Sequence, residues 1–222
     1  MFHVKQTCFL ILLVFGYALT FGQGVYTYKP VPVSIQLPAD TSLRNPIERL
    51  GSAYAISPFE KDFIYYLNYV RVHPAEFRRM AVEPYLKAYP SLKAEYGESL
   101  LADLASFPGA GALSPSGKLF QIARQHSADL GRHDMMSHQS SDGTTTQQRF
   151  DKVGLLCGTE CINMGDYPNA LEVLLSLLID YKVTNKGHRK SLLNPKMKSI
   201  GVGAGRNNSN TLQYTVADLG CD

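Results

Sequence analysis

Apolar side chains recur every three or four residues along most of this 222-residue chain, and this spacing predicts amphipathic helices. The clearest start is Ser57-Pro58-Phe59-Glu60, where serine can cap a helix, proline suits its first position and glutamate completes a capping box. From there a helix carries Phe63, Ile64, Leu67 and Val70. The further helices are expected over residues 74–80, 91–107, 115–131, 144–152 (with Thr144 as its cap), 168–181 and 188–193.

The hydrophobic period changes from helical to alternating in three short segments, which predicts strands. In Thr159–Met164, alternation places Glu160 and Ile162 on one face and Cys161 and Asn163 on the other. Residues 199–204 and 211–217 flank a turn-rich connection and form an expected antiparallel hairpin. Because helices come first and the sheet is completed late, the pattern predicts an α+β fold with helices packed on the sheet.

The first residues have the proportions of a signal peptide. Lys5 precedes an apolar run of about 13 residues, Cys8–Thr20, whereas a membrane span needs roughly 20. Small residues then favour cleavage before Gln23, so residues 1–22 are expected to be a signal peptide and the chain to be secreted, in the periplasm or outside the cell. No transmembrane segment would follow cleavage. The alternative is a retained N-terminal anchor helix.

Residues 23–56 combine tyrosine and valine with the prolines Pro30, Pro32, Pro38 and Pro46, which oppose a long helix. We expect an extended N-terminal arm. It either docks partly on the domain, through Tyr26, Tyr28, Val33 and Ile35, or forms a mobile linker, and its composition favours docking. Residues 57–222 are long enough for one well-cored domain.

Charge and cysteines limit the functional classes. The net charge is only +3, too small and too dispersed for a nucleic-acid surface, so no nucleic acid is expected as a partner. Cys8 leaves with the signal peptide, and an oxidising compartment would allow two of Cys157, Cys161 and Cys221 to pair. A disulfide involving Cys157 or Cys161 is expected without a fixed partner. A metal bound by these cysteines is not expected, because the sequence places no further thiolate or imidazole ligand beside Cys157 and Cys161.

Three short polar, glycine-flanked pieces carry the candidate chemistry: His138, Glu160 and His188. Imidazole and carboxylate groups bind divalent metals or move protons near neutral pH. His126 and His133 lie one heptad apart, which is typical of one packed and one solvent-facing histidine. Ser137 beside His138 does not make a hydrolytic triad, because adjacency supplies neither base geometry nor an oxyanion hole. Walker, dinucleotide, His-Glu-x-x-His and kinase motifs are absent from the sequence.

Several of these pieces occur together in one order, from about Ser57 to Gly220, and this order resembles a bacterial CAP domain, the cysteine-rich secretory protein, antigen 5 and pathogenesis-related 1 superfamily. The pieces are Leu67–Arg71, Ala123–Asp129, Ser137-His138 with Asp142-Gly143, Arg149, Gly158-Thr159-Glu160, Gly187-His188-Arg189, Ile200–Gly203 and Tyr214–Gly220. The resemblance implies a three-layer α-β-α sandwich with a small, mainly antiparallel sheet. It also implies a surface cleft with two histidines, His138 and His188, and two acidic residues.

The resemblance assigns Glu160 to the first acidic position of the cleft and Asp180 to the second. In many members the second acid follows a tryptophan by three residues, and this chain has no tryptophan; Asp180 is the acidic residue near the end of the corresponding helix. Cys161 and Met136 also depart from the asparagine and the aromatic residue usual at those positions.

Two functional hypotheses follow for this cleft. In the first, an exported, non-enzymatic CAP protein uses His138 and His188 to hold Zn²⁺ or another divalent metal and to bind an extracellular or envelope ligand, a lipid, glycan or protein. In the alternative, a metal-dependent hydrolase acts on extracellular peptide or envelope polymer with Glu160 as general base. A purely structural polar network of these residues is the third possibility. The first is favoured because the resemblance implies a fold whose members mostly lack an agreed reaction, and because the sequence shows no substrate-specific pocket.

Overall fold

The computed structural model describes residues 33–222, so the expected signal peptide and the first part of the N-terminal arm, with Tyr26 and Tyr28, lie outside the described residues. Along the described chain, helices are interspersed with the four short strands of one sheet. The elements are α1 (Thr41–Gly51), α2 (Pro58–Val72), α3 (Pro74–Phe77), the π-helical turn η1 (Arg78–Val82), α4 (Glu83–Ala88), α5 (Pro90–Leu92), the π-helical turn η2 (Lys93–Gly97), α6 (Glu98–Ser106), β1 (Ser114–Pro115), α7 (Gly117–His133), α8 (Thr146–Lys152), β2 (Gly158–Gly165), α9 (Ala170–Ile179), α10 (Gly187–Leu192), β3 (Ser199–Arg206) and β4 (Gln213–Gly220).

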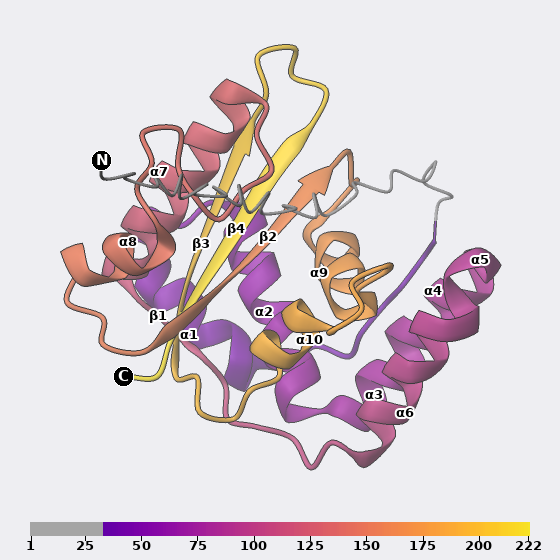
Figure 1. The fold of residues 1–222 in the computed structure, drawn as a ribbon. Coiled ribbons are helices and arrows are strands. Elements are labelled where there is room, and N and C mark those ends of the chain that lie inside the picture. Colours follow the sequence, from indigo (N-terminus) through magenta and orange to yellow (C-terminus); the bar gives the residue numbers. More distant parts are fainter. Residues whose placement is uncertain (1–32) are drawn as a thin grey trace, which may run out of the picture.

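A four-stranded sheet with the order β1-β3-β4-β2 forms the middle layer of the fold. β4 pairs antiparallel with both β2 and β3, and only the two-residue β1 runs parallel to β3, so the sheet is mixed but mainly antiparallel. Figure 1 shows α7 and α8 on one side of the sheet and α2, α9 and α10 on the other. The expected three-layer α-β-α sandwich is therefore confirmed, and β2 is an edge strand.

Three glycines on β3 let α7 lie directly against the sheet. Gly201, Gly203 and Gly205 alternate on one strand face, and a Cβ on any of them would collide with the backbone of α7. The closest backbone atoms belong to Leu119, Ala123 and Ser127, which are four residues apart along the helix. A side chain at any of these strand positions would force the two layers apart.

The opposite face of the sheet holds the larger hydrophobic core, where α2 packs against α9. Arg71 of α2 is fully buried there and donates hydrogen bonds to the backbone carbonyls of Gly111, Leu192, Asn194 and Met197 over 2.7–3.1 Å. Because these carbonyls lie before β1 and at or just beyond the end of α10, one guanidinium connects α2 to the two segments that lead into the sheet. Burial lowers the pKa of Arg71 to about 10.

The expectation of an extended arm is wrong for part of its length, because residues 41–51 form the helix α1 with Pro46 inside it. Asp40 caps this helix, and Leu43 and Ile47 are buried in the same core as α2. A proline inside a helix costs about 3 kcal/mol, and the burial of this apolar face offsets that cost in a helix of only three turns. Before α1, Val33 and Ile35 pack against the core, which agrees with the expected docking.

Two element boundaries also differ from the expectations. Ser114-Pro115 forms the short strand β1 instead of starting a helix, and Ser116 precedes α7. Thr145, not Thr144, caps α8, and it does so in a capping box with Gln148. The capping box of Ser57 and Glu60 at the start of α2 is confirmed.

Candidate functional site

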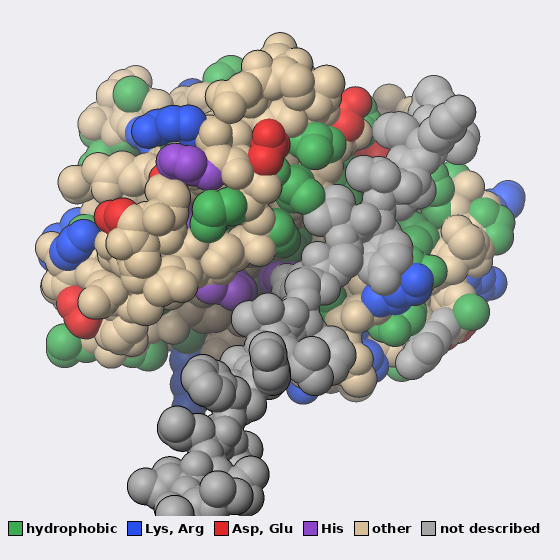
Figure 2. All heavy atoms as spheres, turned by 45° about the horizontal axis from the view of Figure 1, so that its top comes forward, with side chains coloured by type: hydrophobic (Ala, Val, Ile, Leu, Met, Phe, Trp, Pro, Cys, Tyr) green, Lys and Arg blue, Asp and Glu red, His purple; other side chains and the backbone are tan. Residues whose placement is uncertain are grey.

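A pocket of about 160 Å³ lies beside the edge strand β2 and takes its walls from both helical layers. His138, from the loop before α8, and His188, from α10, both line it. The other lining residues are Glu160, Val183, Asn185, Gly187 and Ser191. Figure 2 shows histidine side chains reaching the surface of this part of the molecule beside a hollow. Residues 138, 160 and 188, distant in sequence, therefore meet at one surface site.

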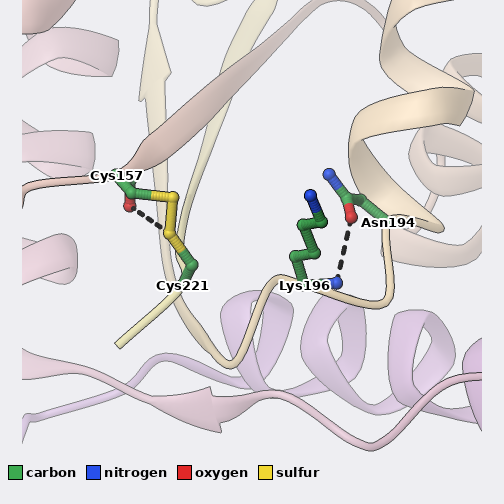
Figure 3. The surroundings of a disulfide bond; sticks show 4 residues. All are labelled: Cys157, Asn194, Lys196 and Cys221. Atoms are coloured by element: carbon green, nitrogen blue, oxygen red, sulfur yellow. Dashed lines mark hydrogen bonds between the residues drawn. A yellow bond between two sulfur atoms is a disulfide. The ribbon is translucent and has the colours of Figure 1, made fainter.

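A disulfide fixes the start of β2, immediately before the site. Cys157 pairs with Cys221 near the C-terminus, across a sequence separation of 64 residues. The bond faces the connection between α10 and β3, where Asn194 accepts a hydrogen bond from the backbone amide of Lys196 (Figure 3). Cys161 is the buried free cysteine among the described residues, and burial raises the pKa of its thiol. The expectation of a disulfide involving Cys157 or Cys161 is thus met through Cys157.

On one side of the pocket, Glu160 orients His138. Nδ1 of His138 lies 2.7 Å from Oε1 of Glu160, while about half of the His138 side chain remains exposed. Because a carboxylate accepts and does not donate, Nδ1 carries the proton, and in the neutral form of the ring the lone pair lies on Nε2. The predicted alternation along β2 places Glu160 on the α7 side of the sheet, whereas Asn163 donates to Ser176 of α9 on the other side.

Glu160 itself is almost fully buried and is held by several donors. Oε1 also accepts from the hydroxyl of Thr146 over 2.9 Å, and Oε2 accepts from Nη2 of Arg149 over 2.5 Å. Burial alone raises the pKa of Glu160, but the hydrogen bond from His138 and the charge of Arg149 outweigh burial and hold the pKa below its ordinary value. Glu160 is therefore a carboxylate near neutral pH.

On the other side, Asp180 orients His188 through local chain geometry. Asp180 ends α9 in the left-handed conformation, with φ 57°, which aspartate tolerates better than most residues. Its Oδ1 lies 2.6 Å from Nδ1 of His188, and its Oδ2 accepts from the backbone amide of Arg189 over 3.0 Å. This second imidazole is therefore also protonated at Nδ1, and it is 10% exposed.

Arg189 holds the short helix α10 in place. Its guanidinium donates to the carbonyls of Leu178 and Ile179 at the end of α9 and to Asp103 and Ser99 of α6. Both arginines of these motifs form ion pairs, Arg149 with Glu160 and Arg189 with Asp103. His188 thus rests on a helix that is fixed from beneath.

The structure also separates the other two histidines as expected. His126 of α7 is buried, and its ring contacts the carbonyl of Ser137 and the hydroxyl of Ser140, whereas His133 is exposed. Burial lowers the pKa of His126. His126 therefore supports the loop that carries His138 as a neutral ring.

Sequence reasoning missed one residue behind the pocket, Asp218 of β4. It is fully buried and lies directly across from Glu160 in the β2–β4 register. Alternation along 214–218 places it on the same face as the buried residues Tyr214 and Val216, so an acidic residue at a core position was the signal that could have found it.

The donor set suits a loosely held ion more than a structural metal. Among residues 33–222 there is no group of three or more histidine, cysteine, aspartate and glutamate side chains that could hold a metal ion. Two Nε2 atoms supported by carboxylates at Nδ1 match the usual environment of metal-binding histidines, but the remaining coordination positions would need water or ligand atoms.

Among residues 33–222, no helix has the length and apolar character needed to span a membrane.

Comparisons with known proteins identify the family. Residues 64–219 match the model of the cysteine-rich secretory protein family, CAP. No curated protein matches the chain.

Two solved structures are similar to the chain at low identity. An extracellular SCP-domain protein from Bacillus anthracis str. Ames aligns at 19% identity and a TM-score of 0.40, over 56% of this chain and 38% of that one. An outer surface protein from Borrelia burgdorferi aligns at 20% identity and a TM-score of 0.42, over 60% of this chain and 92% of that one.

Proposed function

This chain belongs to the cysteine-rich secretory protein family, and we propose that it is an exported, non-enzymatic member whose cleft binds a divalent ion such as Zn²⁺ and, through that ion, an extracellular ligand. Export is inferred from the sequence of residues 1–22. The ion would be held by His138 and His188, with Glu160 and Asp180 supporting the two imidazoles.

The observation that carries this proposal is the matched state of the two histidines. Each lines the same pocket, and each donates its Nδ1 proton to a buried carboxylate at 2.7 or 2.6 Å. In their neutral form both rings therefore offer an Nε2 lone pair, and a carboxylate behind a histidine both fixes its tautomer and strengthens it as a ligand. A bound ion would supply Lewis acidity and open coordination positions.

The contacts of Glu160 favour a ligand-binding function of the cleft over a hydrolytic one. A general base needs a free lone pair directed at the proton that it removes, within hydrogen-bond distance of a bound water. The oxygens of Glu160 already accept from His138, Thr146 and Arg149, and its pKa is held below the ordinary value, which makes it a weak base. Positioning His138 is the role that these contacts favour.

The size of the pocket limits which part of a ligand can enter. A volume of about 160 Å³ is below the roughly 300–1,000 Å³ of sites that enclose a drug-sized molecule. Asn185 and Ser191 add polar groups to the wall. We infer that a lipid, glycan or protein partner would place one small oxygen-bearing group at the ion and make its other contacts outside the pocket.

Calorimetric titration of the metal-free secreted chain with ZnCl₂ tests the proposal. Wild type should bind one Zn²⁺, and the double variant His138→Ala/His188→Ala should bind at least 10-fold more weakly. His133→Ala is the matched control, because that histidine is exposed and lies outside the pocket lining. If wild type and the double variant bind equally, the metal-binding proposal is wrong.

A further inference from the structure

A second carboxyl group lies behind Glu160, and no donor serves it. Asp218 is 0% exposed, and neither of its side-chain oxygens has a hydrogen-bond partner among the described residues. Its neighbours across the sheet are Glu160 on β2 and Gly201 on β3. Since a side chain at Gly201 would meet the backbone of α7, the carboxyl group of Asp218 is enclosed between the sheet and that helix.

Two acidic groups, Asp218 and Glu160, are buried together with one permanently charged cation, the guanidinium of Arg149. Glu160 faces it from β2, Arg149 contributes its guanidinium from α8, and His126 approaches Glu160 from α7, with Nε2 3.8 Å from Oε2. Cys161 points to the other face of β2 as a thiol, and burial keeps His126 neutral. Arg149 donates to Glu160 and not to Asp218, so an ionised Asp218 would be a buried charge without compensation.

We propose that Asp218 is a positioning residue that remains a neutral carboxylic acid and donates its proton to Glu160. The proposal concerns the same cleft as the proposed metal site, and it adds a group that makes no hydrogen bond or ion pair with His138 or His188. A protonated Asp218 would no longer lack a hydrogen-bond partner, because the carboxylate of Glu160 can accept its proton.

The electrostatics point the same way. Burial, and then the negative charge of Glu160, raise the pKa of Asp218 well above its ordinary value. The pKa of Glu160 is lowered at the same time. Two interacting carboxyl groups whose pKa values are driven apart keep one proton between them over a wide pH range.

With this proton, Asp218 becomes a fourth donor to the Glu160 carboxylate, beside His138, Thr146 and Arg149. His138 and Thr146 contact Oε1, Arg149 contacts Oε2, and Asp218 approaches from the neighbouring strand. A carboxylate held in this way cannot rotate away from His138. Asp218 would therefore fix the tautomer and direction of His138 from behind the strand, without entering the pocket.

The direct test needs no metal, and it is read on the wild-type chain, with the variant Asp218→Asn used only to assign the signal. In metal-free wild type, the ¹³C signal of the Asp218 carboxyl carbon, assigned by its loss in Asp218→Asn, should remain that of a protonated acid from pH 5 to pH 8. A signal of an ionised carboxylate at pH 7 would overturn the proposal.

Proton linkage gives a second measurement on the same chain. A folded-state acid that keeps its proton makes folding less favourable as pH rises above the unfolded value, so the unfolding constant of wild type relative to Asp218→Asn should rise about tenfold per pH unit from pH 5 to pH 8. A ratio independent of pH would contradict a retained proton. Asp218→Asn can still donate to Glu160, whereas Asp218→Leu cannot.

The state of His138 separates positioning from a purely structural role. Asp218→Asn should keep the wild-type ¹⁵N shifts of the His138 ring, and Asp218→Leu should move them towards a mixture of tautomers; equal shifts in both variants would refute the positioning role. Zinc titration distinguishes the two proposals. Loss of zinc binding with a protonated Asp218 would reject only the metal site, and an ionised Asp218 with intact zinc binding would reject only this inference.

Discussion

The two sides of the cleft build the same pair, a carboxylate behind an imidazole, by different means. On the His138 side, Glu160 belongs to an edge strand and reaches a half-exposed ring with the help of Arg149 from α8 and Thr146. On the His188 side, Asp180 ends one helix and binds a nearly buried ring eight residues later, together with the next backbone amide. The first pair depends on distant charges, whereas the second depends on the path of the chain.

This difference indicates where each side can be disturbed. The His138 side should respond to changes in charge and pH, because Glu160, Arg149 and Asp218 are buried together on one face of the sheet. The His188 side should respond to changes in the backbone between α9 and α10. A variant that affects one side should therefore leave the ring of the other side in place.

Removing the guanidinium on the His138 side should have the largest effect. Arg149→Leu leaves the Glu160 carboxylate buried without its partner, and we expect the free energy of unfolding to fall by about 3–5 kcal/mol. Urea denaturation measures this loss. The NMR signals of the His138 ring should shift, and those of His188 should not.

Arg132→Leu is the matched control for this change, since Arg132 is exposed on α7. It should alter stability by no more than about 0.5 kcal/mol. If Arg149→Leu is as mild as this control, the charge network does not support the His138 side.

The family resemblance assigns both carboxylates from the sequence, but only on the His188 side are the contacts around the carboxylate local in the chain. Asp180, His188 and Arg189 lie within ten residues, so local motifs and the family resemblance bring them together. The partners of Glu160 on the His138 side come from α7, α8 and β4. Glu160 and Asp218 are more than 50 residues apart in the sequence and meet only through the register of β2 and β4, which is set by the assembled sheet.

The fold shows the same limit in α1. Helical periodicity and capping predicted α2, α7 and α9, whose apolar stripes are plain in the sequence. In residues 41–51, Pro46 argued against a helix, and only the contact of Leu43 and Ile47 with α2 outweighs that local preference. Tertiary packing therefore determines that α1 is helical, and this packing cannot be predicted from the local sequence pattern.

Removing the carboxylate on the His188 side should have an intermediate effect on zinc. Asp180→Gly keeps the left-handed conformation, because glycine adopts it freely, but His188 loses its acceptor. If the metal site exists, zinc affinity should fall about 10–100-fold while the chain stays folded. Calorimetry and circular dichroism measure the two quantities.

Asp134→Gly controls for the backbone in this comparison. Asp134 also ends a helix in the left-handed conformation, with φ 49°, but its carboxylate accepts from Tyr214 and lies outside the pocket lining. Zinc affinity should not change in this variant. Equal losses in both variants would mean that the turn, and not the carboxylate, matters to His188.

A pair of threonines gives the smallest and most direct comparison of the two sides. Thr146 donates its hydroxyl to charged Glu160 over 2.9 Å, whereas the Thr159 hydroxyl lies 2.9 Å from the neutral hydroxyl of Ser191 beside His188. Hydrogen bonds to charged groups contribute roughly 1.5–3 kcal/mol and neutral ones roughly 0.5–1.5 kcal/mol. Thr146→Val should therefore lower the free energy of unfolding more than Thr159→Val in urea denaturation at pH 7. The gap should close as the pH falls through the lowered pKa of Glu160, because the protonated acid no longer attracts the hydroxyl so strongly. A gap that is absent at pH 7, or that persists in acid, would show that the His138 side does not depend on the charge of Glu160.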